Sequence, residues 1–499
     1  MKKNNFQLSA KVIDIEARVA WIVLIHQEDC QNLGIRPGDG LVIHLKGQSI
    51  GCYVDVTDTL VKRGEIGIFE DLAQRFSIET GEVLEISLLG KPKSLEAIQK
   101  KLSGKELNYK EIYEIISDIV SRKLNDVAVA FFVASSFFEK ISPRELFYLT
   151  KAMAETGTQI TFPGIVADKH SVGGLAGNET TPIIVPIVAS YGIFIPKTCS
   201  RAITSASGTA DTFETIAPIS FGTKKLKSIV NKTKGCIVWG AGDIVPSDAR
   251  IIEVASQLLI ESFPKMVSSI MAKKIALGIK NLVVDVPVNP FAKVKSINKA
   301  EELKKIFEDV AKRFKIKVKV SINKAREPIG RGIGPALQIR DDLKVLEQRK
   351  DKPLDLEKRA LELAGYILEL SGKARTGKGY DMARDSLYSG RALKKFQEIV
   401  VAQGGNKNIS SEDIRLSDKK YDVKSHQSGR IKLIHNKNLI EICRILGAPY
   451  IKEAGVYLHK KTGEKVKRGE VLFTLYGGSP LRLELALKAL KKKNPYFIQ

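Results

Sequence analysis

A glycine-rich segment between residues 166 and 181 carries the strongest indication of chemistry in this sequence. Its central run, KHSVGG at 169–174, places a lysine, a histidine and a serine directly before two glycines. Glycines let backbone N–H groups approach a ligand closely, and a helix N-terminus adds about half a positive charge. The segment ends at Thr181, where an apolar helix is predicted to begin. We therefore predict a phosphate-binding loop between a strand and a helix; the alternative is a plain strand-to-helix turn.

A second polar segment, CSRAITSASGTAD, covers residues 199–211. Small hydroxyl and glycine residues surround Arg201 and would allow a ligand to approach the backbone. An arginine can hold a phosphate or a carboxylate through two parallel hydrogen bonds. A Ser/Thr-rich surface loop is the alternative, but the segment follows a short apolar strand and so adjoins the predicted core.

Two further positions are weaker candidates for ligand binding. Ser269 and Lys273 are four residues apart, so they share one face of a predicted helix. Lys293 follows a buried strand predicted over 282–288, near the sheet edge where α/β proteins bind ligands. Each pattern alone arises often by chance.

These segments need a sheet and helices to position them, and the sequence predicts a multidomain α/β protein in four parts. Residues 1–90 hold short strands and form a small β-rich N-terminal domain. Residues 91–165 form a helical bundle domain, on which further segments from the α/β region are expected to pack. Strands and helices alternate over 166–405, which predicts a large α/β domain with a mixed sheet. Residues 406–499 form an α+β C-terminal domain.

Local signals place several elements within these domains. Asn108 can cap a helix, and the run Ser142-Pro-Arg-Glu145 has the pattern of a helix start with a proline in the first turn. A strand is expected over 160–166, leading into the glycine-rich loop.

The composition limits the function classes. Lysine and arginine number 80 against 56 aspartate and glutamate residues, a net charge of +24. This favours anionic partners such as nucleic acid, an acidic surface or a phosphorylated small molecule, although a soluble protein with a lysine-rich surface would look the same. The longest apolar stretch, 127–138, is too short to cross a bilayer, and the start MKKNNFQLSA has no signal-peptide core. The five cysteines are far apart, so we expect free thiols, no metal site and a cytoplasmic location.

In combination, these motifs resemble the thymidine/pyrimidine-nucleoside phosphorylase family over residues 94 to 476. The matching motifs are, in order, KHSxGG at 169–174, SRAITS at 200–205 with GTAD at 208–211, Ser269-x-x-x-Lys273, and Lys293. The additional N-terminal domain and the SRAITS motif are most similar to the AMP phosphorylase branch. A neighbouring bacterial branch of thymidine phosphorylases shares both features.

The resemblance implies an enzyme that uses orthophosphate as co-substrate to cleave an N-glycosidic bond, with no metal or other cofactor. It also implies that the helical and α/β domains close over the substrates and exclude water. The phosphate-binding positions of the family are matched by Lys169, Ser171, Thr181 and Thr209. The catalytic positions are matched by Glu261, His170 and Lys273. The remaining substrate-binding positions are matched by Gly174, Ser200, Arg201, Ala202, Ile203, Thr204, Ser205, Thr209, Ser269 and Lys293.

Two positions depart from the family pattern. The AMP branch has an aspartate, proposed to protonate the departing base, where this chain has Glu261, eight residues before Ser269. The thymidine enzymes carry an arginine at the position of Val254, and its loss disfavours a thymine-specific site. These departures leave open an inactive protein that keeps the fold.

The expected reaction is therefore phosphorolysis of AMP, or of CMP or UMP, to the free base and ribose 1,5-bisphosphate. The alternative is a thymidine phosphorylase that gives thymine and 2-deoxyribose 1-phosphate. We expect a homodimer or a larger homo-oligomer and no membrane partner. Nucleic-acid binding, suggested by the charge, is disfavoured because aromatic residues are few and no such motif is present.

Overall fold

The computed structural model of the 499-residue chain describes residues 5–17, 21–137, 141–202, 205–240, 242, 244–257 and 262–499. Ile203, Thr204 and Glu261, which have predicted roles, lie outside the described residues. The chain divides into two compact units, one formed by Met1–Gly157 with Val245–Ser269 and the other by Thr158–Ile244 with Ile270–Gln499. The N-terminal and helical parts therefore share one unit, and the α/β and C-terminal parts share the other.

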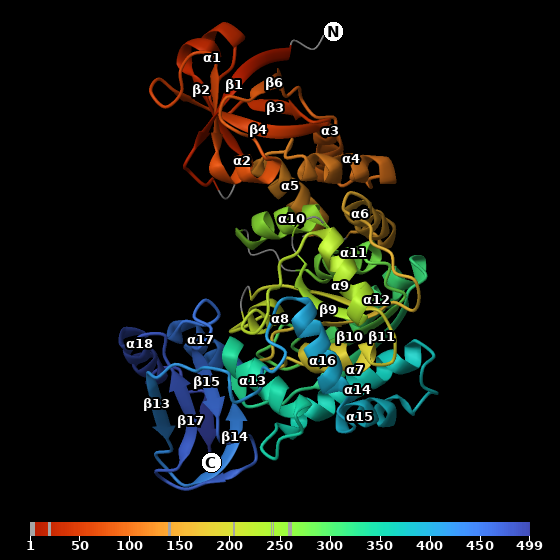
Figure 1. Cartoon of the computed structure of the whole chain (residues 1–499), viewed down its shortest axis with the longest axis vertical. Helices are drawn as coiled ribbons and strands as arrows, with labels where there is room; N and C mark the ends of the chain where they lie inside the picture. Colours follow the sequence, from red (N-terminus) through yellow and green to blue (C-terminus); the bar gives the residue numbers. More distant parts are fainter. Residues whose placement is uncertain are drawn as a thin grey trace. The chain divides into compact units, whose positions relative to one another are not determined.

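The N-terminal strands close into a barrel in the order β1-β5-β2-β4-β3-β6 (Figure 1). β6 pairs antiparallel with both β1 and β3, which closes the sheet and removes its edges. Inward-facing side chains such as Ile25, Ile43 and Ile66 form the barrel core. This confirms the β-rich N-terminal part of the predicted fold. The elements are β1 (Asn5–Ile13), β2 (Ile22–His26), α1 (Gln27–Leu33), β3 (Gly40–Leu45), β4 (Gln48–Thr57), β5 (Glu65–Phe69), α2 (Glu70–Phe76) and β6 (Val83–Leu88).

Helices from two stretches of sequence form the helical part of the same unit. Asn108 and Glu111 exchange side-chain-to-backbone hydrogen bonds at the start of α4, and Ser142 and Glu145 do so at the start of α6. Both helices therefore begin where their capping residues predicted. α10, which follows much later in the chain, packs against α4 and α5. The helices are α3 (Ser94–Leu102), α4 (Tyr109–Val120), α5 (Asp126–Phe137), α6 (Pro143–Glu155) and α10 (Pro246–Gln257).

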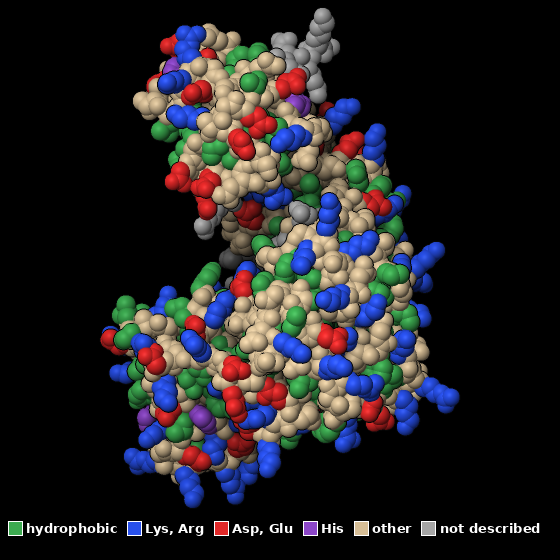
Figure 2. All heavy atoms as spheres, in the orientation of Figure 1, with side chains coloured by type: hydrophobic (Ala, Val, Ile, Leu, Met, Phe, Trp, Pro, Cys, Tyr) green, Lys and Arg blue, Asp and Glu red, His purple; other side chains and the backbone are tan. Residues whose placement is uncertain are grey.

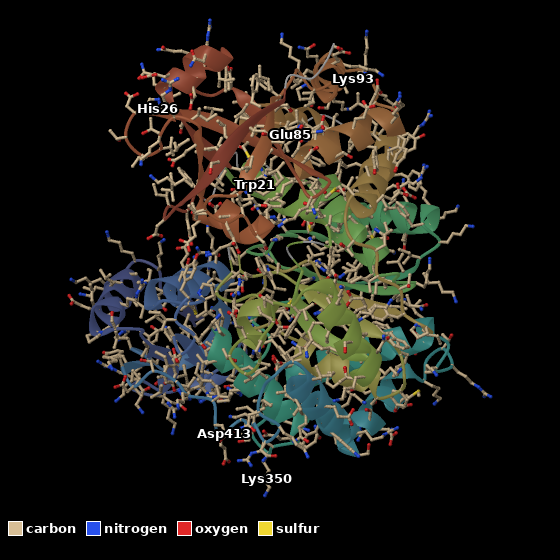
Figure 3. All side chains as sticks on the ribbon, turned by 45° about the horizontal axis from the view of Figure 1, so that its top comes forward. Trp21, His26, Glu85, Lys93, Lys350 and Asp413 are labelled. Atoms are coloured by element: carbon tan, nitrogen blue, oxygen red, sulfur yellow. The ribbon has the colours of Figure 1, made fainter. Side chains whose placement is uncertain are left out.

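The barrel contacts these helices through Trp21, which is labelled in Figure 3. The Trp21 ring meets the Phe76 ring of α2, within the barrel part, edge-on at 5.2 Å, and the guanidinium of Arg122, just after α4, lies 5.0 Å from its centre. The backbone N–H of Gly51 donates to the carbonyl of Ser121 at 3.0 Å. A side chain on Gly51 would collide with Arg122 backbone atoms at 2.8 Å, so the approach requires glycine.

The α/β part is built on parallel strands. β11, β10 and β7 form one sheet and β8 and β9 a second, and a parallel bridge between Val166 and Phe194 joins β7 to β8. Helix α7 is buried along its whole length and packs against α14 and α16. The elements are β7 (Ala167–Ser171), α7 (Thr181–Ala189), β8 (Ile195–Cys199), α8 (Thr209–Phe213), α9 (Thr223–Thr233), β9 (Gly235–Trp239), α11 (Phe263–Ala276), β10 (Asn281–Val288), α12 (Ile297–Arg313), β11 (Lys317–Lys324), β12 (Gly332–Ile333), α13 (Pro335–Leu346), α14 (Leu354–Leu370), α15 (Gly379–Tyr388) and α16 (Arg391–Ala402).

The strand expected over 160–166 is wrong. The residues that enter the sheet are the polar run Ala167–Ser171, and before them only Val166 forms a bridge. Polar residues can occupy this buried strand because Asp168 forms ion pairs with buried lysines inside the core. The lysine, histidine and serine of the KHSVGG run therefore lie on the strand itself, at its carboxyl end.

The C-terminal part contains two antiparallel sheets, in the orders β12-β15-β17-β13 and β16-β14-β18. β12 comes from the α/β region, so strands of residues 166–405 form antiparallel as well as parallel pairs. The predicted four-part α/β fold class is confirmed. The elements are β13 (Lys420–Lys424), β14 (Gly429–Ile434), α17 (Asn436–Leu446), β15 (Gly455–Leu458), β16 (Lys465–Val466), β17 (Val471–Tyr476), α18 (Pro480–Leu490) and β18 (Tyr496–Ile498).

Lysine and arginine side chains are spread over the face shown in Figure 2 and do not gather on one element. Among the described residues, no helix combines the length and the apolar character that crossing a bilayer requires.

Candidate active site

Lys169 is the middle residue of β7, and its ammonium group is buried without an ion-pair partner among the described residues. Its side chain is 2% exposed, and among the described residues no carboxylate oxygen lies within 4 Å of its Nζ atom. Burial lowers the pKa of Lys169, and the more distant Asp285 and Glu179 oppose this effect only in part. A buried cation without a contacting counter-ion favours the binding of an anion beside it.

Ser171 is held by a buried carboxylate on the neighbouring strand. Its Oγ donates to Asp285 Oδ2 at 2.9 Å, and Asn178 Nδ2 donates to the same oxygen at 2.9 Å. Arg359 of α14 pairs with the other oxygen, Oδ1. Burial raises the pKa of Asp285, but Arg359 and Lys169 outweigh it, so the pKa lies below its ordinary value and the group is ionised.

Glu179 brings the two polar segments predicted from the sequence together. Thr209 Oγ1, at the start of α8, donates to Glu179 Oε2 at 2.8 Å. The N–H of Thr181, at the start of α7, donates to Glu179 Oε1 at 3.2 Å. The N-termini of α7 and α8 thus meet at one buried carboxylate, beside the loop that follows Ser171.

His170 lies on β7 near a buried group of charges. The Asp168 carboxylate is 2.5 Å from Lys274 Nζ and 3.7 Å from Lys197 Nζ. Burial lowers the pKa of His170 well below its usual value, and the nearby lysines lower it further. His170 is therefore neutral at pH 7 and can act as a hydrogen-bonding group without carrying charge.

Lys273 and Ser269 lie on α11, which brings Lys273 near the end of β7. Lys273 is one of the lysines whose charge lowers the pKa of His170. Ser269 is four residues earlier and therefore on the same helix face. The predicted spacing on one helix is present, and Lys273 lies within electrostatic range of the β7 residues.

Arg201 has a partner that the sequence did not indicate. Its Nη1 and Nη2 atoms lie 2.7 and 2.6 Å from the two carboxylate oxygens of Glu214. Glu214 also accepts from Lys452 Nζ at 2.8 Å, and these cations lower the pKa of Glu214 to about 2, with Arg201 the main cause. The guanidinium that was predicted to hold a ligand is thus engaged by a protein carboxylate.

The backbone of the second polar segment is organised by Asp211. Its carboxylate accepts from the N–H groups of Ala202 at 2.7 Å and Gly208 at 3.0 Å. The carbonyl of Ser200 accepts from the N–H of Ala210 at 3.4 Å. Ser205 Oγ donates to the carbonyl of Ser207 at 3.0 Å. The described residues of this segment therefore form a closed turn; Ile203 and Thr204 lie outside the described residues.

Lys293 lies directly against the glycine-rich loop. Gly174 adopts φ +86°, and a Cβ atom there would lie 2.6 Å from the backbone nitrogen of Lys293. Only glycine fits such a contact. The exposed side chain of Lys293 therefore starts beside the KHSVGG segment.

Four important residues were missed by sequence reasoning. Asp285 had a signal, since it is a lone charge in the apolar strand VVDVPV, and Glu179 lies inside the glycine-rich motif. Glu214 had no distinguishing pattern. Asn436, whose contacts with Gly174 are described below, is 262 residues away in sequence. Only the fold could have revealed the last two.

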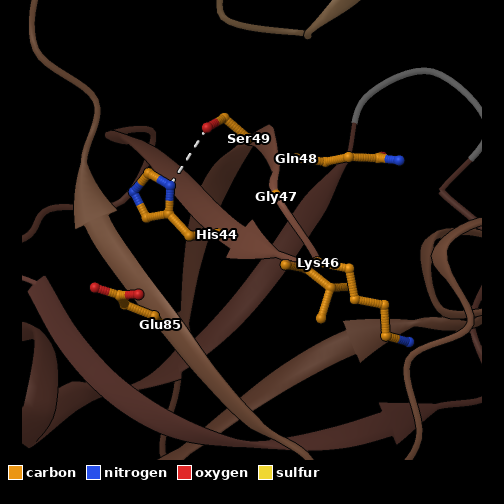
Figure 4. A pocket seen from close by; sticks show the side chains of 7 residues that line it. His44, Lys46, Gly47, Gln48, Ser49 and Glu85 are labelled. Atoms are coloured by element: carbon orange, nitrogen blue, oxygen red, sulfur yellow. Dashed lines mark hydrogen bonds between the residues drawn. The ribbon is translucent and has the colours of Figure 1, made fainter.

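A surface hollow of about 460 Å³ lies elsewhere, on the N-terminal barrel (Figure 4). It is lined by the β3–β4 hairpin and Glu85, and Ser49 Oγ lies 3.3 Å from His44 Nδ1. It contains none of the predicted site residues. Within the described ranges, no group of three or more His, Cys, Asp and Glu side chains is arranged to hold a metal ion.

Comparison with known protein families assigns the three parts of the chain that follow the N-terminal barrel. Residues 95–157 match the helical bundle domain of the glycosyl transferase family, and residues 164–393 match the α/β domain of that family. Residues 431–497 match the C-terminal domain of pyrimidine nucleoside phosphorylases. The crystal structure of anthranilate phosphoribosyltransferase from Thermus thermophilus shares the fold, with a TM-score of 0.51 and 17% identity over 62% of this chain and 99% of that chain. Fold and domain composition thus define a glycosyl transferase of the nucleoside phosphorylase class.

Full-length relatives narrow this class further. The chain is 39% identical to AMP phosphorylase from Methanocaldococcus jannaschii, over 99% of this chain and 97% of that protein. It is 38% identical to AMP phosphorylase from Methanospirillum hungatei, over 99% of this chain and 96% of that protein. The chain belongs to the AMP phosphorylase family, which confirms the resemblance seen in the motifs.

Proposed function

We propose that this protein catalyses the phosphorolysis of AMP to adenine and ribose 1,5-bisphosphate, with CMP and UMP as further candidate substrates. The observation that carries the proposal is similarity over nearly the whole chain to AMP phosphorylases. The buried Lys169, which has no ion-pair partner among the described residues, supports it, because an orthophosphate would supply a counter-ion. Thymidine phosphorolysis is not favoured, since these full-length relatives are AMP phosphorylases and the arginine of the thymidine enzymes is replaced by Val254.

In the proposed reaction, a phosphate oxygen forms a bond to C1′ of the ribose while the C1′–N bond breaks. The bonding electrons leave with the base, which takes up a proton. Lys169, Ser171, Thr181 and Thr209 are proposed to bind orthophosphate, with positive charge and backbone N–H groups holding the nucleophile in place. Their convergence on the ends of β7, α7 and α8 supports this role.

The nucleotide is proposed to bind beside the orthophosphate. His170, Ser269 and Lys273 would contact the sugar or the base. Gly174, Lys293 and the segment 200–205 would contact the nucleotide and its 5′-phosphate, for which Arg201 would have to exchange Glu214 for the ligand. Glu261 is proposed as the acid that protonates the departing base. Orthophosphate is the only co-substrate proposed, with no metal or organic cofactor.

A cytoplasmic location and a homodimeric or larger assembly stay predictions; light scattering of the purified protein tests the latter.

The test is to incubate purified protein with AMP, CMP, UMP or thymidine, each with and without orthophosphate, and to measure the free base by chromatography. We expect phosphate-dependent release of adenine from AMP. Release of thymine from thymidine, with no base from any nucleotide, would contradict the proposal.

The Glu261→Gln variant tests the proposed acid and the alternative of an inactive protein in the same assay. Removal of a general acid lowers turnover by about 10²–10⁴-fold. Glu308→Gln, an exposed carboxylate on α12, is the matched control and should leave turnover unchanged. Wild-type turnover in Glu261→Gln would remove this residue from the mechanism.

A further inference from the structure

The first residue of α17 reaches from the C-terminal part of the chain into two loops of the α/β part. Asn436 Oδ1 accepts a hydrogen bond from the N–H of Ala176 at 2.7 Å, and its Nδ2 donates to the carbonyl of Gly174 at 2.6 Å. Nδ2 also lies 3.4 Å from the carbonyl oxygen of Phe291. The Asn436 side chain is completely buried, so loss of these bonds would leave buried backbone groups without partners.

Both loops carry residues that the proposed function assigns to phosphate groups. Gly174 belongs to the KHSVGG segment, and Phe291 precedes Lys293 by two residues. The Phe291 ring stacks on the ring of His435, the residue that caps α17, with 3.8 Å between ring centres. One buried amide and one ring contact therefore fix the loops to each other and to a rigid helix.

The glycine-rich loop needs such an external support. Gly173, Gly174 and Gly177 all have positive φ values, between +70° and +86°. Glycines lose more conformational freedom on ordering than other residues, so a loop rich in them is costly to hold in one conformation. Hydrogen bonds from a helix that is already folded reduce the ordering that is left for the ligand to drive.

We propose that Asn436 is a positioning residue for the phosphate sites: it holds the 173–176 segment in its ligand-binding conformation against residues 291–293 and thereby sets the affinity for orthophosphate. This inference rests on the proposed function, in which Ser171 and Thr181, on either side of this segment, bind orthophosphate, and Gly174 and Lys293 contact the nucleotide and its 5′-phosphate. It gives the C-terminal domain a direct part in substrate binding.

The test compares the full-length variants Asn436→Asp and Asn436→Ala with wild type. Asn436→Asp keeps the shape and the acceptor for Ala176 but turns an oxygen towards the Gly174 carbonyl. Orthophosphate binding is measured by calorimetry without nucleotide, and KM for orthophosphate and kcat are measured with AMP. We expect Kd and KM for orthophosphate to rise at least tenfold in both variants, with kcat within threefold of wild type.

Asn438→Asp is the matched control, because it adds the same charge two residues later on α17, where the Asn438 side chain donates a hydrogen bond to the carbonyl of Asn494 at 3.3 Å. Its Kd and KM should stay within twofold of wild type.

A purely structural role would lower the active fraction, and hence kcat, with KM unchanged; that result, or wild-type orthophosphate affinity, would overturn the inference. If Asn436→Asp does not fold, the orthophosphate Kd and KM of Asn436→Ala test the inference. Orthophosphate binding that depends on Asn436, in a protein that releases no base from AMP, would contradict the proposed function alone.

Discussion

The buried lysines on and around β7 differ in whether a carboxylate of the protein neutralises their charge. Lys274 and Lys197 share the Asp168 carboxylate, whereas Lys169 has no carboxylate oxygen within 4 Å among the described residues. Burial therefore lowers the pKa of Lys169. The folded state then binds fewer protons than the unfolded state between the two pKa values, so stability rises with pH in that window. In its charged form, the buried lysine costs stability in the absence of an anion, because burial removes its hydration.

Replacement of this lysine should separate binding from stability. In Lys169→Met, we expect the free energy of unfolding to equal or exceed that of wild type, because a buried charge is removed. The Kd for orthophosphate should rise at least tenfold. Chemical denaturation and calorimetry measure the two quantities, with the exposed Lys280→Met as control. Unchanged orthophosphate affinity would show that Lys169 does not contact the anion.

At the scale of elements, the β7–loop–α7 unit is fixed by close backbone contacts. A Cβ atom on Gly177 would lie 2.0 Å from the carbonyl oxygen of Ile329, and one on Gly174 would lie 2.6 Å from Lys293 N. Gly173 has a similar positive φ but open space around it. The glycines of this loop thus serve different purposes: some permit close packing, and Gly173 only permits the turn.

These purposes can be distinguished by alanine substitution. Gly173→Ala should lower the free energy of unfolding by about 1–2 kcal/mol through backbone strain alone. Gly177→Ala should cost about 3 kcal/mol or more, because strain and a backbone collision add. Urea denaturation of both variants measures the difference. Equal losses would mean that the loop moves away from Ile329 without cost.

At the scale of the whole molecule, an ion-pair network joins separate parts of the chain. Lysines and arginines cover the face seen in Figure 2 without forming one patch, which does not favour a nucleic-acid surface there. In contrast, Lys452 of the C-terminal part and Arg201 of the α/β part converge on Glu214. This network connects the C-terminal part to the loop proposed to bind nucleotide.

The network should stabilise the fold in a pH-dependent way. The folded pKa of Glu214, about 2, lies below its ordinary value of 4.5, so its contribution is present above pH 4.5 and is lost as the pH falls towards 2. We expect Glu214→Gln to be less stable than wild type by about 1–2 kcal/mol at pH 6, a value reduced for solvent screening. The difference should shrink at pH 3. Urea denaturation at both pH values checks this, and a difference independent of pH would exclude the ion pairs as its cause.

The sequence by itself determined the features that form between residues close together in the chain. The capping pairs at Asn108 and Ser142 fixed two helix starts, and the glycine-rich run before an apolar helix indicated the loop between β7 and α7, which is proposed to bind phosphate. Ordered motifs indicated the family. Such signals are readable because hydrogen bonds and turns of this kind form within a few residues of sequence.

The tertiary structure decided the contacts that form between residues far apart in the sequence. A polar run became the buried strand β7 because Lys197 and Lys274 reach Asp168 from other elements. Arg201 meets Glu214, and Asn436 binds a loop 262 residues away, only after the chain has folded. No local pattern encodes these contacts, since each arises from the packing of elements whose order in space differs from their order in sequence.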